Sequence, residues 1–411
     1  MIDLLLRECR LPDGGEPVHV AVADGRIVSV GREAPAAREV IEGDGRLVTP
    51  GLVEAHLHLD KALLHDRISA TAGTAAEAIR LTGEAKRHFT VEDIRARARR
   101  VLDMAIASGT TAMRGHVEVD PILELSALDA VLPLKAEYAP ALDLQLCAFA
   151  QEGILQSPGT EGLLRRALTR GADLVGGCPY NDTDARAHIE IVFALAQAFD
   201  VDVDFHIDFF DEPDHLHVRD VIEATVRTGW QGRVSVGHLT ELAALPIPEQ
   251  EAIAADLAAA RIGVIALPTT DLYLMGRGDV SNIRRGITPI RRLLEAGVAV
   301  ALATNNVRNP FTPVGTADLA DLPFLATVAA HMGGAREMRM LLDTITVHPA
   351  RMLRLPDYGL TPGCRANLVV WDCLTAQDAV ATPPPRLLSI KDGRVTIEHE
   401  HRIRERWRLC P

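Results

Sequence analysis

Short apolar runs alternate with longer amphipathic stretches along most of the chain. Between residues 51 and 345, runs such as LQLCAFA at 144–150 are separated by stretches such as VEDIRARARRVLDMAIASG at 91–109. Short apolar runs bounded by turn signals are typical of buried strands, and the longer stretches have the spacing of helices. Strands that alternate with helices predict a parallel sheet with crossover helices.

The number of strand candidates indicates how this sheet is arranged. Eight runs qualify, at 47–56, 110–117, 144–150, 172–177, 201–208, 233–239, 262–268 and 298–304. Eight strands, each followed by a helix, are the count for a closed barrel. We therefore predict an α/β protein with a (β/α)8 TIM barrel at 51–345. The arginines of one helix, Arg95, Arg97, Arg99 and Arg100, are expected on its solvated outer face.

Both ends of the chain have a different pattern, in which short strands are joined by tight turns. Asp24-Gly25 interrupts one alternating run near the start, and Asp392-Gly393 interrupts another near the end. Asp-Gly between two apolar runs favours a β-hairpin. We predict a small β-sandwich domain built from both chain termini, with residues 1–50 and 346–411 as its two parts.

Composition and charge narrow the class of protein. The chain has 411 residues, 47% of them hydrophobic and 24% charged, with a net charge of −13. An acidic chain lacks the basic footprint of a nucleic-acid-binding protein. No apolar run approaches the length of a membrane helix, and the six cysteines form no C-x-x-C pair. We expect a cytoplasmic protein with a small-molecule substrate, no nucleic acid and no membrane partner, and we leave a homo-oligomer open.

Histidines recur where the predicted strands end. His56 and His58 share one face of the first strand, and His116, His206 and His238 end the second, fifth and sixth. The carboxyl ends of barrel strands form the active-site face, and converging imidazoles bind divalent metals. Separate core histidines bonded to the backbone are the alternative, which requires the same coincidence at four strand ends.

Several segments, in order, resemble the cytosine deaminase-like group of the amidohydrolase superfamily. They are GLVEAHLHLD, RGHVEVD, LQLCAFAQEGILQSPGTEGLLRRALTRGADLVGGCPY, FHID, VGHLTEL and TNNVRNPFTPVG. The resemblance covers most of the chain. It implies one divalent metal, zinc before iron or manganese, held by His56, His58 and His206, with His238 beside a bound water. The fourth-strand segment ADLVGGCPY has no Lys, so the carbamylated lysine of binuclear relatives is not expected.

Two positions depart from this family at residues that handle protons. Asn305 stands where the family has an Asp, and Phe209 stands where it has a Glu. An amide can coordinate a metal weakly but cannot accept a proton as a carboxylate does. Asp208 could replace the missing acid or could orient a ligand histidine, and Asn305 is kept as a candidate at the catalytic centre.

The resemblance also suggests where the substrate binds. Gln151, Asn306 and Phe311 occupy substrate-facing positions, and neutral amides suit a polar, uncharged heterocycle or amide. Lys61 is a fourth candidate, facing either a substrate carboxylate or a neighbouring acid such as Glu118.

The predicted function is metal-dependent hydrolysis of a carbon–nitrogen bond other than a peptide bond, in a cyclic amide, amidine or N-heterocycle, without efficient cytosine deamination. Two alternatives stay open. One is a catalytically disarmed barrel that binds a small nitrogenous ligand. The other is a lyase or isomerase that uses the metal as a Lewis acid.

Overall fold

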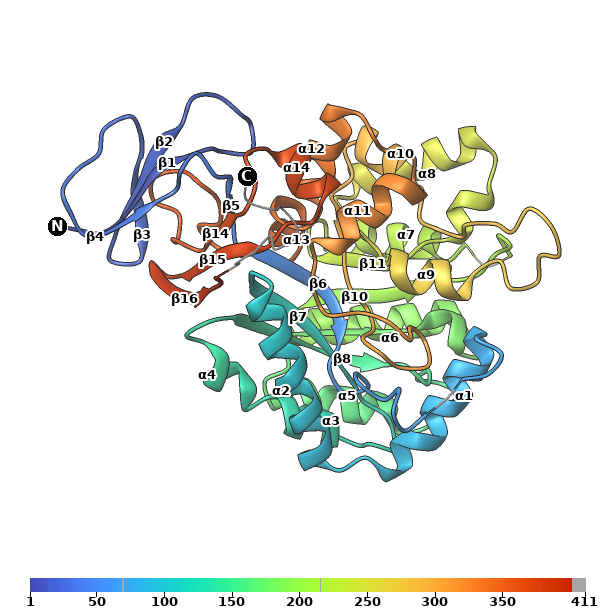
Figure 1. The fold of residues 1–411 in the computed structure, drawn as a ribbon. Coiled ribbons are helices and arrows are strands. Elements are labelled where there is room, and N and C mark those ends of the chain that lie inside the picture. Colours follow the sequence, from blue (N-terminus) through green and yellow to red (C-terminus); the bar gives the residue numbers. More distant parts are fainter. Residues whose placement is uncertain (69, 215, 401–411) are drawn as a thin grey trace, which may run out of the picture.

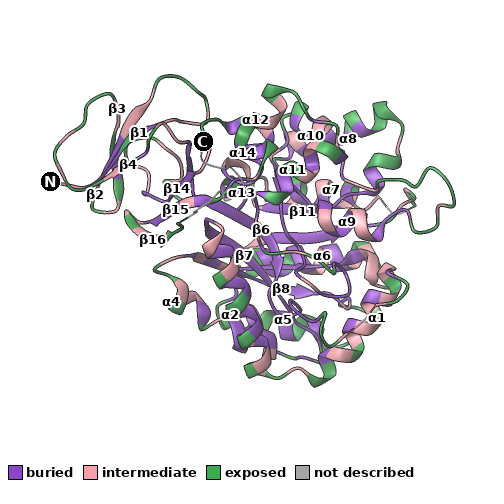
Figure 2. Cartoon of the chain, in the orientation of Figure 1, coloured by how far each residue is buried: buried purple, intermediate pink, exposed green. Residues whose placement is uncertain are grey.

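Eight parallel strands form the centre of the molecule. The computed structural model describes residues 1–68, 70–214 and 216–400. The strands pair in chain order, each with the next, and are buried (Figure 2). They are β6 (Leu52–His58), β7 (Thr110–Glu118), β8 (Asp143–Ala150), β9 (Leu174–Gly177), β10 (Asp202–Ile207), β11 (Val234–His238), β12 (Gly263–Ala266) and β13 (Val300–Leu302). Each overlaps a predicted run to within two residues at either end of the observed strand, so the predicted barrel is confirmed.

The first and last strands meet through the residues that follow β13. The backbone N–H of Asn305 donates to the carbonyl oxygen of His56 at 2.8 Å, and the N–H of His58 donates to the carbonyl oxygen of Asn305 at 2.9 Å. These bonds close the barrel beside two of the predicted metal ligands.

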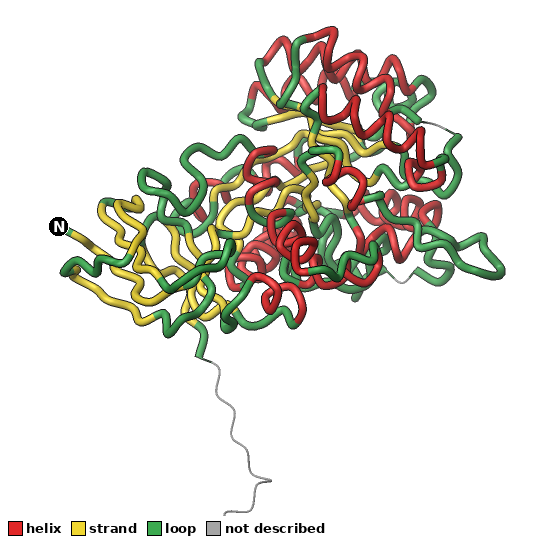
Figure 3. Tube along the Cα trace, turned by 90° about the horizontal axis from the view of Figure 1, so that it is seen from above, coloured by secondary structure: helices red, strands yellow, loops and turns green. Residues whose placement is uncertain are grey.

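Helices surround this barrel on its outside (Figures 1 and 3). They are α1 (Ala75–Ala85), α2 (Val91–Ala107), α3 (Ser126–Val131), α4 (Leu134–Tyr138), α5 (Thr160–Thr169), α6 (Ala185–Phe199), α7 (Val218–Thr228), α8 (Ile247–Ala259), α9 (Pro268–Leu274), α10 (Ile290–Glu295), α11 (Asp321–Ala329), α12 (Ala335–Asp343), α13 (Val347–Met352) and α14 (Ala376–Ala381). Single 3₁₀ turns lie at Lys86–His88, Pro179–Asn181 and Glu241–Ala244. None of the helices among the described residues is long and apolar enough to cross a bilayer.

A small β-sandwich lies beside the barrel and is built from both ends of the chain (Figure 1). One four-stranded sheet contains β1 (Ile2–Cys9), β2 (Val18–Ala23), β3 (Arg26–Gly31) and β4 (Ala37–Glu42). The other contains β5 (Val48–Pro50), β14 (Leu368–Trp371), β15 (Arg386–Lys391) and β16 (Arg394–Glu398). Leu4 and Val20 of the first sheet pack with Leu368 and Ile390 of the second, as the predicted sandwich requires.

Tight turns and ion pairs define the edges of the sandwich. The Asp24-Gly25 and Asp392-Gly393 turns have φ values of 49° and 73°, and of 49° and 74°, which are the left-handed values that two-residue hairpins need. Asp143, at the start of β8, accepts from Arg365 at 2.8 Å and from buried Lys391 at 2.9 Å, which joins sandwich to barrel.

The boundaries at 50/51 and 345/346 stay predictions. β5 and β6 lie on either side of the first, while α13, beyond the second, still contacts β6 and β13 of the barrel. Residues 401–411 of the predicted C-terminal part, including Cys410, lie outside the described residues.

One surface prediction is wrong. Arg97 is buried, and its guanidinium donates to the carbonyl oxygens of Asp60 and Ala62, at 2.6 and 2.9 Å, and to Asp93. Arg97 therefore faces inward and fixes the chain after β6, because those carbonyls lie beyond the strand and need a donor.

Candidate metal-dependent active site

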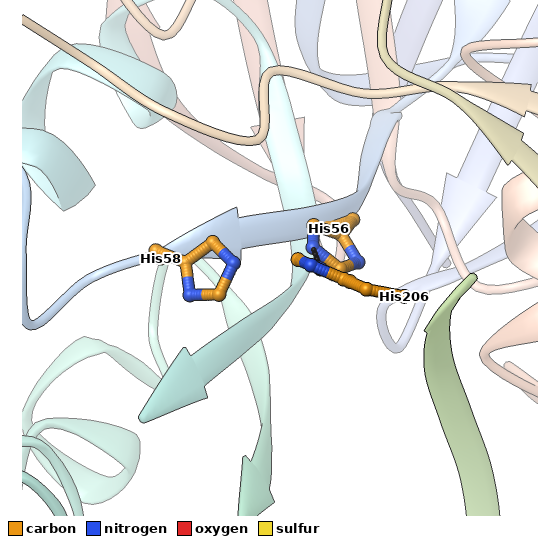
Figure 4. A group of neighbouring side chains, drawn as sticks. All are labelled: His56, His58 and His206. Carbon is orange, nitrogen blue, oxygen red and sulfur yellow. Dashed lines mark hydrogen bonds between the residues drawn. The ribbon is translucent and has the colours of Figure 1, made fainter. Parts of the chain in front are cut away.

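Three histidines converge at the carboxyl end of the barrel. His56 and His58 come from β6 and His206 from β10 (Figure 4). One nitrogen from each ring lies within 4.8 Å of the others, and the Nε2 atoms of His56 and His206 are 2.6 Å apart. All three residues are buried. Alternation along β6 puts His56 and His58 on one face. Closure of the parallel strands into a barrel brings His206, near the carboxyl end of β10, close to them.

The electrostatics of these rings suit a divalent cation. Burial lowers the pKa of His58 and His206 well below the usual value and that of His56 to about 3. Neighbouring histidines add to this lowering, while Asp204 opposes it at His56. Neutral imidazoles keep the lone pairs that bind metal. Within the described chain both ring nitrogens of His58 are buried and without a hydrogen-bond partner. This donor set fits one divalent metal.

A buried carboxylate lies behind the cluster. Asp204, two residues before His206 on β10, approaches Nδ1 of His56 and Nε2 of His116 at 3.4 Å each, and Arg114 donates to it at 2.9 Å. Burial opposes ionisation, but the contacts with His116 and His56 hold the pKa of Asp204 well below its usual range. Sequence reasoning missed Asp204, although its period-two spacing from His206 was a usable signal.

His238 ends β11 beside this cluster. Its ring lies 4.9 Å from that of His206 and 4.1 Å from that of Phe209, measured between centroids. Its Nδ1 lies 2.7 Å from Oδ1 of Asp271, in the first turn of α9. Burial raises the pKa of Asp271, against the opposing effect of His238. Sequence reasoning missed Asp271, because its place in a helix beyond β12 gives no strand periodicity.

Asn305 lies at the barrel seam, next to His56. Its backbone has φ of 59°, and its side-chain amide donates to Oγ1 of Thr270 at 3.2 Å. Its Oδ1 is buried and lacks a hydrogen-bond partner among the described residues. The amide oxygen is therefore available to a ligand, while a carboxylate at this position is absent.

Asp208 has contacts that differ from those expected of a proton carrier. β10 ends at Ile207, and Asp208 has φ of 51°, so the alternation that would align it with His206 stops. Its carboxylate accepts from the backbone N–H groups of His217 and Val218, at 2.8 and 3.1 Å. Burial, with Glu241 nearby, raises its pKa well above the usual value. These contacts favour a role in holding the start of α7.

The four predicted substrate-binding residues lie together. Lys61 donates to Gln151 at 2.9 Å and lies 4.9 Å from the centroid of the Phe311 ring. Asn309 joins the group, because its amide donates to the carbonyl oxygen of Lys61 and to Oδ1 of Asn306, at 3.1 and 2.7 Å. Each of these side chains is nearly buried.

Lys61 also has an acidic partner within the protein. Its ammonium lies 2.9 Å from Glu118, whose other oxygen accepts from Lys86 at 3.1 Å. Although burial opposes it, these two cations lower the pKa of Glu118 to about 2. Of the two partners considered for Lys61, a substrate carboxylate or a neighbouring acid, the structure shows the acid, Glu118.

An apolar cluster covers this side of the site. Phe209 and Phe311 pack with Ala78 of α1 and with Leu274 and Met275 at the end of α9. The wall beside His238 is therefore hydrocarbon rather than a proton donor.

Comparison with known proteins agrees with this architecture. Residues 39–397 match the amidohydrolase family. The chain is 28% identical over 407 residues to N-isopropylammelide isopropyl amidohydrolase of Pseudomonas sp. strain ADP, covering 97% of this chain and 98% of that protein. It is 27% identical to pterin deaminase of Rhizobium rhizogenes, covering 92% and 87%.

A solved structure extends the likeness to the whole fold. 5-Methylcytosine deaminase from Klebsiella pneumoniae, liganded with 5-fluorocytosine, is similar with a TM-score of 0.93 and 31% identity, covering 98% of this chain and 99% of that one. The chain belongs to the amidohydrolase family. It is an enzyme of the class that hydrolyses carbon–nitrogen bonds other than peptide bonds.

Proposed function

We propose that this protein hydrolyses a carbon–nitrogen bond in a small N-heterocycle, cyclic amide or amidine, using one divalent metal held by His56, His58 and His206. The observation that carries this proposal is the convergence of three buried, neutral imidazoles at the carboxyl end of the barrel. Zinc suits a site of imidazole nitrogens. A divalent cation there supplies a Lewis acid and activates water as a nucleophile near neutral pH.

The protein's own groups would bind the substrate and hold protons. His238 is the ring placed to hold a proton beside the metal ligands. Gln151 and Asn306 offer both donors and acceptors to a polar ring, and Phe311 and Phe209 provide apolar walls. Relatives named for ammelide, pterin and methylcytosine chemistry support a nitrogen-rich ring as substrate class.

Metal analysis tests the site directly. Protein purified with metal present should contain about one equivalent of zinc, iron or manganese. His56→Ala and His206→Ala should lose metal and activity together, whereas His65→Ala, at an exposed histidine beyond β6, should keep both. If the first two variants keep full metal and lose only activity, these histidines contact substrate instead.

Product analysis separates hydrolysis from the two alternatives. N-alkylated triazinones, pterins, methylated pyrimidines and cyclic amides form the panel, assayed in ¹⁸O-labelled water. Hydrolysis places label in the product, a lyase or isomerase forms product without label, and a binding protein shifts the melting temperature without product.

Cytosine is expected to be a poor substrate. General acid–base catalysis is worth about 10² to 10⁴ in rate, and neither Phe209 nor Asn305 can carry a proton. Turnover should lie several orders of magnitude below that of a dedicated deaminase. Phe209→Glu combined with Asn305→Asp should raise ammonia release from cytosine. Rapid release by the unaltered protein would overturn this expectation.

A further inference from the structure

The buried carboxylate of Asp271 faces His238. This histidine ends β11, lies against Phe209 and is not one of the proposed metal ligands. The Oδ1 atom of Asp271 lies 2.7 Å from Nδ1 of His238, and both residues are nearly or fully buried. Such a short contact to a carboxylate is typical of a charge-assisted hydrogen bond. The other oxygen, Oδ2, has no hydrogen-bond partner in the described part of the chain. The hydrogen bond that the carboxylate forms with another side chain is therefore the one to His238.

The His238 ring is fixed on several sides. Phe209 packs against it at 4.1 Å and the ring of His206 meets it edge-on at 4.9 Å, between centroids. Its backbone has φ of 73°, and Thr288 donates to its carbonyl oxygen. A ring held this firmly presents the same nitrogen to the site at all times, so its function depends on which nitrogen carries the proton.

Neither of the two positions that sequence reasoning considered supplies this contact to the His238 ring. Asn305 lies three residues beyond the end of β13 and has an amide, which donates to Thr270, the residue before Asp271. Asp208 is bonded to the start of α7. The acid that reaches His238 therefore comes from α9, after β12, and from neither position that sequence reasoning considered.

We infer that Asp271 is a positioning residue that holds His238 as the Nδ1–H tautomer, with Nε2 as the acceptor that faces the reaction. A neutral imidazole has one donor and one acceptor nitrogen, and the partner of the donor decides which is which. Asp271 engages Nδ1 of His238, which leaves Nε2 as the ring nitrogen for water or substrate. The catalytic role of this tautomer rests on the proposed function, whereas the tautomer itself is independent of it.

The tautomer is measured by long-range ¹H–¹⁵N correlation spectra of the zinc-loaded protein labelled with ¹⁵N-histidine. His238→Gln identifies the signal. The unaltered protein should show protonated Nδ1, and Asp271→Asn should move the proton to Nε2, because an amide donates to Nδ1. Asp182→Asn is the matched control, since Asp182 and Nδ1 of His188 form a similar pair at 2.8 Å. It should change the His188 signals and leave those of His238 unaltered.

Activity provides the second readout. With any substrate that the protein hydrolyses, Asp271→Asn should lower kcat by about 10² to 10⁴ with KM little changed and zinc content constant, by analogy with tautomer inversion in a catalytic triad. If no substrate is hydrolysed, the proposed function fails and the spectra still decide the tautomer. Protonated Nε2 in the unaltered protein would overturn the inference, even if Asp271→Asn does not fold. So would an Asp271→Asn protein with an inverted tautomer and full activity.

Discussion

At the scale of single residues, one of the proposed metal ligands has a carboxylate behind it. Asp204 lies 3.4 Å from Nδ1 of His56, the nitrogen opposite the one that faces His206. A carboxylate on the far nitrogen of a ligating histidine fixes its orientation and raises its basicity. Asp204 thus belongs to the site even though it does not reach the metal-facing side.

Asp204→Asn is expected to weaken metal binding about 10- to 100-fold, the usual effect of losing such a partner. Competition with a chelator of known affinity measures this. Asp202→Asn on the same strand is the control, because Asp202 pairs with Arg233 and Arg354 instead, and its affinity should not change. Equal affinities for both variants would remove Asp204 from the site.

Glu54 gives a pH dependence of stability. Burial raises its pKa to about 7, from an ordinary value of 4.5, against hydrogen bonds from Thr304 and the His56 amide. Between these two values the folded protein holds a proton that the unfolded chain has released. The free energy of unfolding therefore falls as pH rises across this window, by about 3 kcal/mol in total.

Glu54→Gln removes this dependence. In metal-free protein unfolded with urea, the variant should gain stability relative to the unaltered protein between pH 4.5 and 7.5. Other titrating groups cancel in the difference. A constant difference over this range would mean that Glu54 has an ordinary pKa.

At the scale of elements, replacing two glycines with alanine should change the stability of the protein in opposite directions. A Cβ on Gly176 in β9 would lie 1.8 Å from the carbonyl oxygen of Asp204 on β10. A Cβ on Gly162 in α5 would meet nothing within 4 Å. Close strand approach needs the first glycine, while the second only weakens its helix.

Gly176→Ala should therefore lower stability by about 1 to 3 kcal/mol or more and disturb the strand that carries His206. Gly162→Ala should raise stability by about 0.5 to 1 kcal/mol. Urea unfolding measures both. A Gly176→Ala protein as stable as the unaltered one would show that β9 and β10 can separate at no cost.

Periodicity predicts elements well where the chain stays regular. All eight barrel strands overlap runs chosen by their apolar pattern, and three histidines at strand ends converge. Asp208 illustrates the limit, because the prediction assumed that β10 continues and the backbone turns to positive φ there. Asp271 illustrates another, since its contact with His238 joins two segments whose relation depends on packing and not on local pattern.

At the scale of the whole molecule, a small cluster of charges joins the two parts. Asp143 starts β8 of the barrel and receives Arg365 and Lys391 from the C-terminal segment. The Lys391 side chain is fully buried. Its other acidic neighbour, Asp392, is farther away, at 3.4 Å, and also pairs with Arg365. A buried ammonium that loses its nearer partner carries a desolvation penalty that water does not repay.

Asp143→Asn should therefore lower the free energy of unfolding by about 1 to 3 kcal/mol. Asp357→Asn is the control, because its pair with Arg26 is half exposed, and exposed pairs are worth about 0 to 1 kcal/mol. Equal effects of the two variants in urea unfolding would show that Asp392 compensates for the loss of Asp143.

The seam between His56 and Asn305 has a consequence for how the chain is made. During synthesis β6 leaves the ribosome long before β13, and β5 long before β14. Until their partners emerge, these early strands have an unpaired edge. Exposed strand edges promote association between nascent chains. Barrel and sandwich are both completed only when the last third of the polypeptide has emerged. A chain that stops early can therefore finish neither part, and premature termination yields no smaller working enzyme.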